Sequence, residues 1–265
     1  TSSLVLATAV IANSNALSLS LPWKPGGGAL VLTARGQWLF ESYQSYYPGT
    51  DVSDLGFNEI RAGLDVQWKF LPRTSATFHG GFFTRLPDVS NRPDDTSGVE
   101  FMAGVNGLVT PHVGVSLKAG YGGTVNATPN YSTFLADIAA EWLPIEGASV
   151  SVGYSRGFGL DPIASSFGTD SAHVTGRIRM AQRYSFRTTV RYDHLSFDHL
   201  PSASGHTDGT SAFWRIEPGV DAAVSKWMTA TLAYAYSSRA SSFPADVPMF
   251  DYSKNEVWLK LSFTY

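Results

Sequence analysis

The sequence predicts an all-β fold: a transmembrane, antiparallel, up-and-down β-barrel of about fourteen strands. Three observations predict it. Apolar and polar residues alternate through most of the chain, short turns alternate with longer polar segments, and Trp recurs at the short turns. A period of two is typical of strands, because successive side chains leave opposite faces. We expect short periplasmic turns, longer extracellular loops and one domain over residues 1–265.

The alternation is clearest in residues 254–265. Val257 and Phe263 lie on one parity there, whereas Glu256 and Lys260 lie on the other. One face therefore suits an apolar medium and the other tolerates water. Similar segments recur along the chain and give an even number of strands, as single-chain bacterial barrels have. The predicted strands are 2–11, 15–23, 28–43, 57–70, 75–86, 97–109, 113–121, 132–142, 148–157, 170–180, 184–193, 212–224, 228–236 and 254–265.

Short and long connections alternate between these strands. Each short turn contains Pro or an aromatic residue, and the six are 21–27, 70–75, 109–114, 142–147, 181–185 and 225–229. The long connections are rich in Asp, Ser, Pro and Gly, which favour loops. They are 44–56, 87–97, 124–131, 158–169, 196–210 and 240–253.

The composition agrees with a membrane barrel. Only 15% of the residues are charged, yet no apolar run approaches the roughly 20 residues of a transmembrane helix. The net charge of −3 argues against nucleic-acid binding, and the absence of Cys excludes disulfides and thiolate metal sites. Residues 4–12 also fit the apolar core of a signal peptide, but no Met or basic segment precedes them. We interpret 2–11 as a strand and infer a cleaved export signal upstream.

A soluble β-sandwich also alternates, so periodicity alone does not exclude it. A propeller needs four short strands per repeat, whereas each period here holds two long ones. Strand length, the asymmetry of the connections and four Trp residues near turns favour the membrane barrel. These residues, which would form a girdle at one membrane interface, are Trp23, Trp68, Trp142 and Trp227.

Four segments carry a resemblance to a known family. They are RAGLDVQWKFLPRTSATFHGGF (61–82), GVNGLVTPHVGVSLKAGYGG (104–123), DIAAEWLP (137–144) and DYSKNEVWLKLSFTY (251–265). Over most of the chain from about residue 61, the sequence resembles the β-barrel porin type 2 family of bacterial outer-membrane proteins. These motifs are structural and include no catalytic signature. The resemblance implies an outer-membrane location. Several family members look associated with surface polysaccharide export, which implies a polysaccharide and periplasmic export components as partners.

The charged residues of the strands share the parity that would face a lumen. Arg or Lys on the lipid-facing side costs roughly 2–4 kcal/mol near the bilayer midplane, so a wet or self-paired interior is the better place for them. The candidate solute-contacting residues are Arg177, Arg179, Arg187, Arg191, Arg215, Glu217, Asp221, Arg61, Asp65, Lys118 and Lys260. The same parity carries Arg35, Glu59, Lys69, Glu100, Asp137, Glu141 and Asp193.

This interior has two interpretations. Arg177, Arg179, Arg187 and Arg191 on adjacent strands, with Arg215 on the next, form a basic cluster suited to anionic solutes or acidic sugars. The alternative is pairing with neighbouring carboxylates, which closes the lumen for stability alone. Inward aromatic residues fill space or stack on sugars, and Phe83, Phe213 and Trp258 are the candidates.

The sequence favours no enzymatic site. The pair Asp193-His194 suggests a hydrolase, but adjacent strand residues point to opposite faces, so Asp193 cannot orient that imidazole. No cluster has the spacing of zinc or calcium ligands. We predict no catalytic residue, cofactor or metal.

The predicted function is passage of hydrophilic material through an outer-membrane barrel in contact with lipid. The resemblance favours polysaccharide export. The alternative is a barrel with a blocked lumen that anchors an envelope complex. The sequence leaves open whether the lumen conducts, what passes, the oligomeric state and the partners. It also leaves open whether the chain belongs to a larger barrel.

Overall fold

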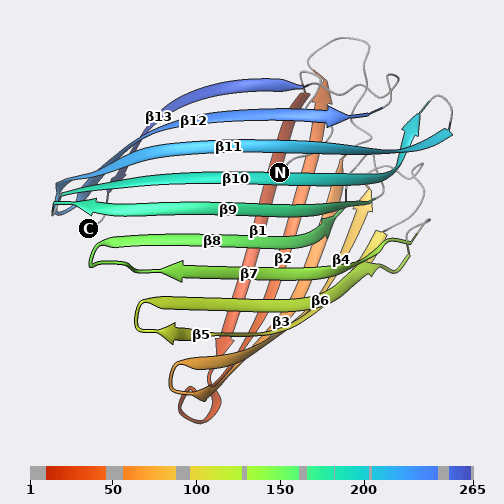
Figure 1. Ribbon diagram of the computed structural model, residues 1–265. Helices are drawn as coiled ribbons and strands as arrows, with labels where there is room; N and C mark the ends of the chain where they lie inside the picture. The colour runs from red at the N-terminus through yellow and green to blue at the C-terminus, as the bar shows by residue number, and fades with distance from the viewer. Residues whose placement is uncertain are drawn as a thin grey trace.

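The computed structural model describes residues 10–45, 56–87, 96–126, 130–160, 166–181, 183–202, 205–243 and 251–263. These residues form one sheet of thirteen strands, each antiparallel to its neighbours in chain order (Figure 1). The strands are β1 (Val10–Trp23), β2 (Leu30–Ser45), β3 (Phe57–Leu71), β4 (Thr74–Pro87), β5 (Thr96–Thr110), β6 (Val113–Thr124), β7 (Ser132–Trp142), β8 (Ala148–Gly159), β9 (Ser166–Met180), β10 (Tyr184–Ser202), β11 (Gly205–Ser225), β12 (Met228–Ser242) and β13 (Tyr252–Phe263). Within these ranges no helix has the length and apolar character needed to cross a membrane.

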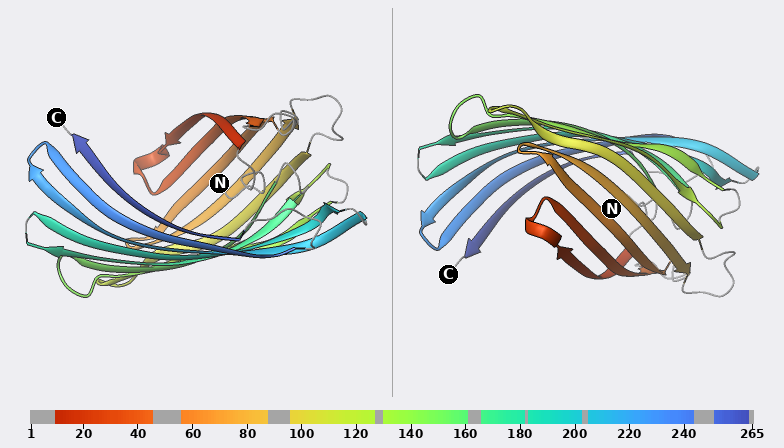
Figure 2. Two further views of the ribbon diagram at one scale, coloured as in Figure 1. Left: turned by 90° about the horizontal axis from the view of Figure 1, so that it is seen from above. Right: turned by 90° about the horizontal axis from the view of Figure 1, so that it is seen from below.

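The sheet is strongly curled. Its two ends, β1–β2 and β13, bend toward the same side and leave a trough between them (Figure 2). Among the described residues β1 and β13 are the ends of the strand order, and they do not pair with each other. The up-and-down antiparallel topology is therefore confirmed, and the sheet is an open, curved one.

The expected fourteenth strand is the first correction. β1 runs without a break from Val10, which pairs with Ser45, to Trp23, which pairs with Leu32. The turn expected between strands 2–11 and 15–23 is absent, because Asn13, Ser14 and Asn15 continue the ladder instead of reversing the chain. The rest of the expected strand, residues 2–9, lies outside the described part of the chain.

All six short turns lie where the sequence predicts them, at one end of the sheet. The first contains the short 3-10 helix η2 (Pro25–Gly27), and Gly26, Gly27 and Gly28 adopt positive φ values of 63°, 88° and 89° there. We call this the turn end and the opposite end of the strands the loop end. Trp23, Trp68, Trp142 and Trp227 lie at the turn end, and all four side chains are exposed.

The long connection predicted over 196–210 is the second correction. β10 continues to Ser202 and β11 begins at Gly205, so most of this segment is paired strand. The register shifts between Phe197 and Leu200, which marks an irregularity in the hairpin. The polar composition of this segment led to the wrong prediction of a loop, because backbone pairing with a partner strand does not require apolar side chains. Figure 1 shows this hairpin projecting beyond its neighbours at the loop end.

The convex face is apolar and exposed. Leu64, Phe101 and Leu259 are among the many large apolar side chains that project from it. Exposing a large apolar side chain to water forfeits about 1.5–3 kcal/mol relative to burying it, and soluble monomers rarely expose continuous apolar surfaces of this kind. An apolar surrounding medium accounts for this face.

The concave face is polar and more crowded. Arg215 on β11 reaches Glu256 on β13 at 3.5 Å, and the Phe83 ring on β4 lies 5.7 Å from the Phe158 ring on β8. Side chains from strands this far apart in the sheet meet on the side toward which it curls. Buried apolar side chains gather toward the loop end of this face, where Leu195 and Phe197 pack against Phe167 and Phe243.

Candidate functional site

The candidate lumen-lining residues share the concave face. The pairing register places Arg187 beside Arg177, and Arg191 beside both His173 and Arg215. Since alternate residues of a strand share a face, every charged residue that the sequence assigns to the lumen has the same orientation. Their placement on one face follows from the register. Whether they contact a solute stays a prediction.

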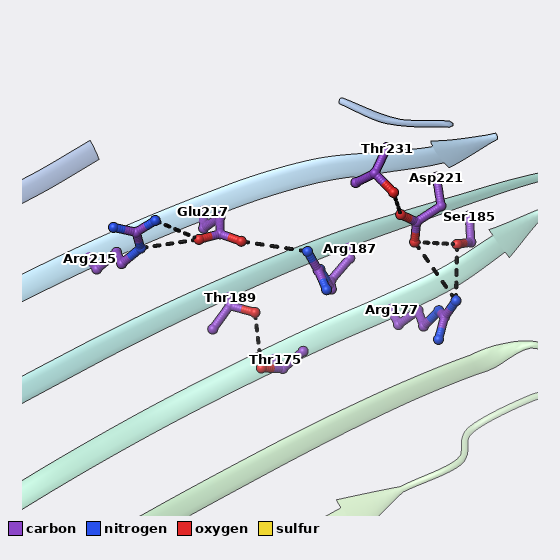
Figure 3. Close-up of polar contacts among 9 residues, drawn as sticks. All are labelled: Thr175, Arg177, Ser185, Arg187, Thr189, Arg215, Glu217, Asp221 and Thr231. Atoms are coloured by element: carbon purple, nitrogen blue, oxygen red, sulfur yellow. Dashed lines mark hydrogen bonds and ion pairs between the residues drawn. The ribbon is translucent and has the colours of Figure 1, made fainter. Parts of the chain in front are cut away.

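The basic cluster is largely paired with carboxylates. Glu217 lies between two of its Arg residues: its Oε2 accepts hydrogen bonds from Arg215 Nε and Nη2 at 3.1 and 2.9 Å, and its Oε1 lies 3.5 Å from Arg187 Nη2 (Figure 3). Arg215 also lies 3.5 Å from Glu256. One carboxylate therefore serves two guanidinium groups.

Asp221 organises a second group nearer the turn end. Its carboxylate accepts hydrogen bonds from Thr231 at 2.7 Å and from Ser185 at 3.2 Å, and it lies 3.8 Å from Arg177 Nη2 (Figure 3). Ser185 also accepts a hydrogen bond from Arg177 at 3.3 Å. The Arg177 ion pair is thus long, and 58% of its side chain remains exposed.

Arg191 makes a tighter pair. Its Nε donates to both carboxylate oxygens of Asp193 at 2.9 and 2.8 Å, and Ser171 donates to the same carboxylate at 2.5 Å. The Asp193 side chain is buried, whereas the Arg191 side chain is 54% exposed. The acid therefore lies against the sheet and the guanidinium faces the trough.

Two of the candidate residues, Arg179 and Lys260, have no ion-pair partner within the described ranges. Arg179 lines a hollow of about 450 Å³ at the turn end, together with His112, Glu141 and Glu146. Its backbone N–H donates to the carbonyl of Gly147 at 2.7 Å, while its side chain is exposed. Lys260 pairs in register with Thr231 on β12.

The other half of the concave face carries a polar bar across β2–β5. Arg35 lies 2.6 Å from Asp65, which lies 2.9 Å from Nδ1 of His79, whose Nε2 lies 3.1 Å from Glu100. Hollows of about 410 and 390 Å³ flank this bar, and Arg35 and His79 line both. His79 is not among the residues predicted from the sequence, because apolar and polar residues alternate only weakly in residues 75–86. His79 lies four positions before Phe83, so the sequence could have placed it on the same inward face.

The remaining candidates on this half are also paired. Glu59 is almost completely buried, and it lies 2.5 Å from Arg61 and 2.7 Å from Arg85. Lys118 lies 3.1 Å from Asp137. Arg85 is a residue that the sequence analysis missed, and its guanidinium carbon lies 3.9 Å from the Phe57 ring centroid.

The inward aromatic residues differ in exposure. Phe83 is only 6% exposed and has the Arg61 guanidinium 5.6 Å from its ring centroid. Phe213 and Trp258 are partly exposed. Phe83 therefore fills space at the loop end, and stacking on a sugar stays a prediction for the other two.

The Asp193 carboxylate accepts its hydrogen bonds from Arg191 and Ser171. His194 is adjacent to Asp193 on the same strand and so leaves the opposite face. In the parts of the chain that the structure describes, no group of three or more His, Cys, Asp or Glu side chains is placed to hold a metal ion.

Structural comparison identifies proteins with a similar fold. The FrpB iron transporter from Neisseria meningitidis (F3-3 variant) matches with a TM-score of 0.60 at 9% identity, over 86% of this chain and 43% of that one. The F5-1 variant apoprotein form gives 0.57 at 10% identity, over 86% and 44%. A loop L8 deletion mutant of OmpT, an outer membrane protein of Vibrio cholerae, matches at 10% identity over 97% of this chain and all of that one. Its TM-score is only 0.38.

The fold is that of an outer-membrane β-barrel protein. The exposed apolar convex face agrees with this, and the predicted location in the outer membrane is confirmed. The chain spans less than half the length of the FrpB proteins that it resembles. No protein-family model and no curated protein sequence matches the chain, so membership of the porin type 2 family stays a prediction.

Proposed function

We propose that this chain forms the wall of an outer-membrane conduit for hydrophilic, preferentially anionic, material. The observation that carries the proposal is the arrangement of charge on the concave face. The guanidinium groups of Arg177, Arg187 and Arg191 remain partly exposed although each has a carboxylate neighbour. Charges that remain exposed on one face of a membrane sheet require water beside them.

The mechanism is passive. Arg presents a planar fork that pairs with carboxylate or phosphate oxygens, so an anionic solute competes with Glu217 and Asp193 for the same donors. The acceptors within the protein keep these donors from binding the solute too tightly. Conduction needs binding sites that attract the solute into the pore but hold it weakly enough for it to leave. Such passage uses no cofactor.

Polysaccharide export is a narrower version of this proposal. It is supported by the resemblance of residues 61–82 and 104–123 to the porin type 2 family. The partly exposed Phe213 and Trp258 offer ring faces to sugars on the same concave face. In this version, periplasmic components deliver the polymer to the turn end.

A second candidate is a barrel with a blocked lumen that anchors an envelope complex. The packed aromatic residues at the loop end favour it: the Phe197 ring lies 5.4 Å from Phe167 and 5.7 Å from Phe243. A third candidate function is specific uptake of a small solute. FrpB, which has a similar fold, is named as an iron transporter.

Single-channel conductance in a planar bilayer tests the proposal. We expect a steady current with anion preference, and a lower anion preference in the double variant Arg187→Ala and Arg191→Ala. The matched control removes two cations from exposed turns, Lys24→Ala and Arg73→Ala, and should keep the preference. If neither the intact protein nor a variant with shortened loop-end connections carried current, the conduit would be rejected and the blocked barrel favoured.

A further inference from the structure

Arg156 and Asp170 carry charge onto the convex, lipid-facing side of the sheet. Most charged residues of the described strands share the concave face, but these two have the parity of the exposed apolar residues Val152 and Val174. They pair in register on β8 and β9. A charge on this face is costly within the hydrocarbon and is tolerated close to the polar headgroups. The depth of the pair in the bilayer therefore decides what surrounds it.

A row of aromatic residues places the pair at headgroup level. The next convex row toward the turn end contains Tyr154, Tyr192 and Trp214. The ring centroids of Tyr192 and Trp214 lie 4.6 Å apart. Tyr and Trp concentrate where hydrocarbon meets water. Arg156 and Asp170 lie one row beyond this belt, on the side of the loop end, so they face the headgroups of the lipid leaflet at that end.

Asp170 holds the Arg156 guanidinium without using all of its donors. Nη1 of Arg156 lies 3.2 Å from each carboxylate oxygen, and the Tyr154 hydroxyl donates to the same carboxylate at 2.5 Å. Both Arg156 contacts use Nη1, and 44% of the side chain remains exposed. Arg pairs readily with phosphate oxygens. Donors on Nε and Nη2 are the groups that would contact the phosphate of a neighbouring lipid.

A groove begins beside Arg156 and crosses the convex face. Its floor is Ala136, Ala119 and Ala103, which pair in register from β7 to β5, and Ala136 pairs with Arg156. A hollow of about 550 Å³ contains Ala119 and Ala103 and extends to Gly80 on β4. Larger exposed side chains form the two walls, with Phe101, Tyr121 and Phe134 toward the loop end and Val105, Leu117 and Ile138 toward the turn end.

The groove runs in the direction of a lipid chain. Arg156 is the ninth residue of β8 counted from the turn end, whereas Phe78, which continues the same row on β4, is the fifth of its strand. The groove therefore approaches the turn end as it leaves Arg156. A lipid of the loop-end leaflet has its headgroup at the loop end and its acyl chains directed toward the bilayer centre. One chain of a lipid held at Arg156 would follow the groove.

We propose that Arg156 and this groove form a binding site for one phosphorylated membrane lipid. The phosphate contacts the exposed guanidinium, and one acyl chain lies over Ala136, Ala119 and Ala103 between the two walls. The charged end of the groove at headgroup level and its apolar walls favour this occupant over a soluble partner. The site lies on the opposite face of the sheet from the trough, so it holds for a conducting barrel and for a blocked one alike.

Photo-cross-linking of the full chain in lipid vesicles tests the site. The vesicles contain a trace of phosphatidylglycerol with a diazirine on one acyl chain, and mass spectrometry locates the labelled peptides. We expect label on β5, β6 and β7. Arg156→Ala should lower this labelling about fivefold, since one basic residue near the membrane surface strengthens anionic-lipid binding by about that factor. The same diazirine chain on diacylglycerol, which lacks phosphate, should label the groove as weakly as phosphatidylglycerol labels the variant.

Ala119→Leu tests the groove separately from the charge. The larger side chain fills the floor, so labelling of β5 beyond it should fall severalfold. Ala119 is exposed, and circular dichroism checks that the variant folds. The matched control is Ala222→Leu, on the convex face of β11 away from the groove, and Arg183→Ala controls for the loss of a cation. Both controls should label like the native chain.

Three results would overturn the proposal. Even labelling of the whole convex face, unchanged by Arg156→Ala, would show ordinary boundary lipid. Equal labelling of the groove by the diacylglycerol probe would show an apolar groove without a phosphate site. An unlabelled groove together with a cross-linked band of doubled mass would show that a second copy of the chain covers it.

Discussion

The two halves of the concave face handle charge differently. On β2–β5, the carboxylates of Asp65 and Glu100 alternate with Arg35 and the His79 imidazole along one continuous bar. On β9–β11, two guanidinium groups share Glu217, and Arg179 has no carboxylate partner within the described ranges. The first half neutralises its charges within the sheet, while the second keeps an excess of positive charge. Under the proposed conduit function, this difference predicts a structural role for the first half and a solute-facing role for the second.

Glu59→Gln should produce the largest effect and would test the structural half. Its carboxylate is almost fully buried between Arg61 and Arg85, so the substitution leaves the Arg85 guanidinium buried without a counter-charge. Removing one partner of a buried pair costs roughly 3–5 kcal/mol. We expect a loss of about 3 kcal/mol, measured as the free energy of unfolding in urea with lipid vesicles.

The control for this variant is Glu146→Gln. Glu146 is exposed in the turn after β7, and its side chain makes no ion pair or hydrogen bond among the described residues. Its substitution should change the unfolding free energy by less than about 0.5 kcal/mol. Equal effects at both positions would remove the structural role assigned to the first half.

Glu217→Gln should have a smaller effect on stability and a clearer one on selectivity. The carboxylate and its two Arg partners are each 20–37% exposed, so solvent screens their interactions. We expect a loss of about 1 kcal/mol on unfolding and a higher anion preference in bilayer recordings, because two guanidinium groups lose their shared acceptor. Unchanged selectivity would contradict the solute-facing role of the second half.

Arg179→Ala should have the smallest effect. Its side chain is exposed and contributes no ion pair among described residues, so stability should not change measurably. Because Arg179 lines the hollow at the turn end, we expect the anion-to-cation permeability ratio to fall by less than about twofold. Arg183→Ala, in the exposed turn after β9, is the matched control. A larger fall than in the Arg187 and Arg191 double variant would move the selective region to the turn end.

Much of this molecule follows from the sequence. Alternation located β3, β7 and β13 to within two or three residues, because a strand in a bilayer must separate apolar from polar side chains at every second position. The six short turns were equally visible, since Pro, Gly and aromatic residues interrupt the alternation there. The same periodicity placed every candidate charge on one face.

Only the tertiary structure decided which charges meet. Glu217 lies between Arg187 and Arg215, and His79 joins Asp65 to Glu100, because the register brings residues 14–30 positions apart side by side. Composition also misled at 196–210, where polar residues form a paired hairpin. Parity along a strand is a local property that sequence determines by itself. Register, curvature and closure depend on partner strands far along the chain, and these decide how the charges are paired.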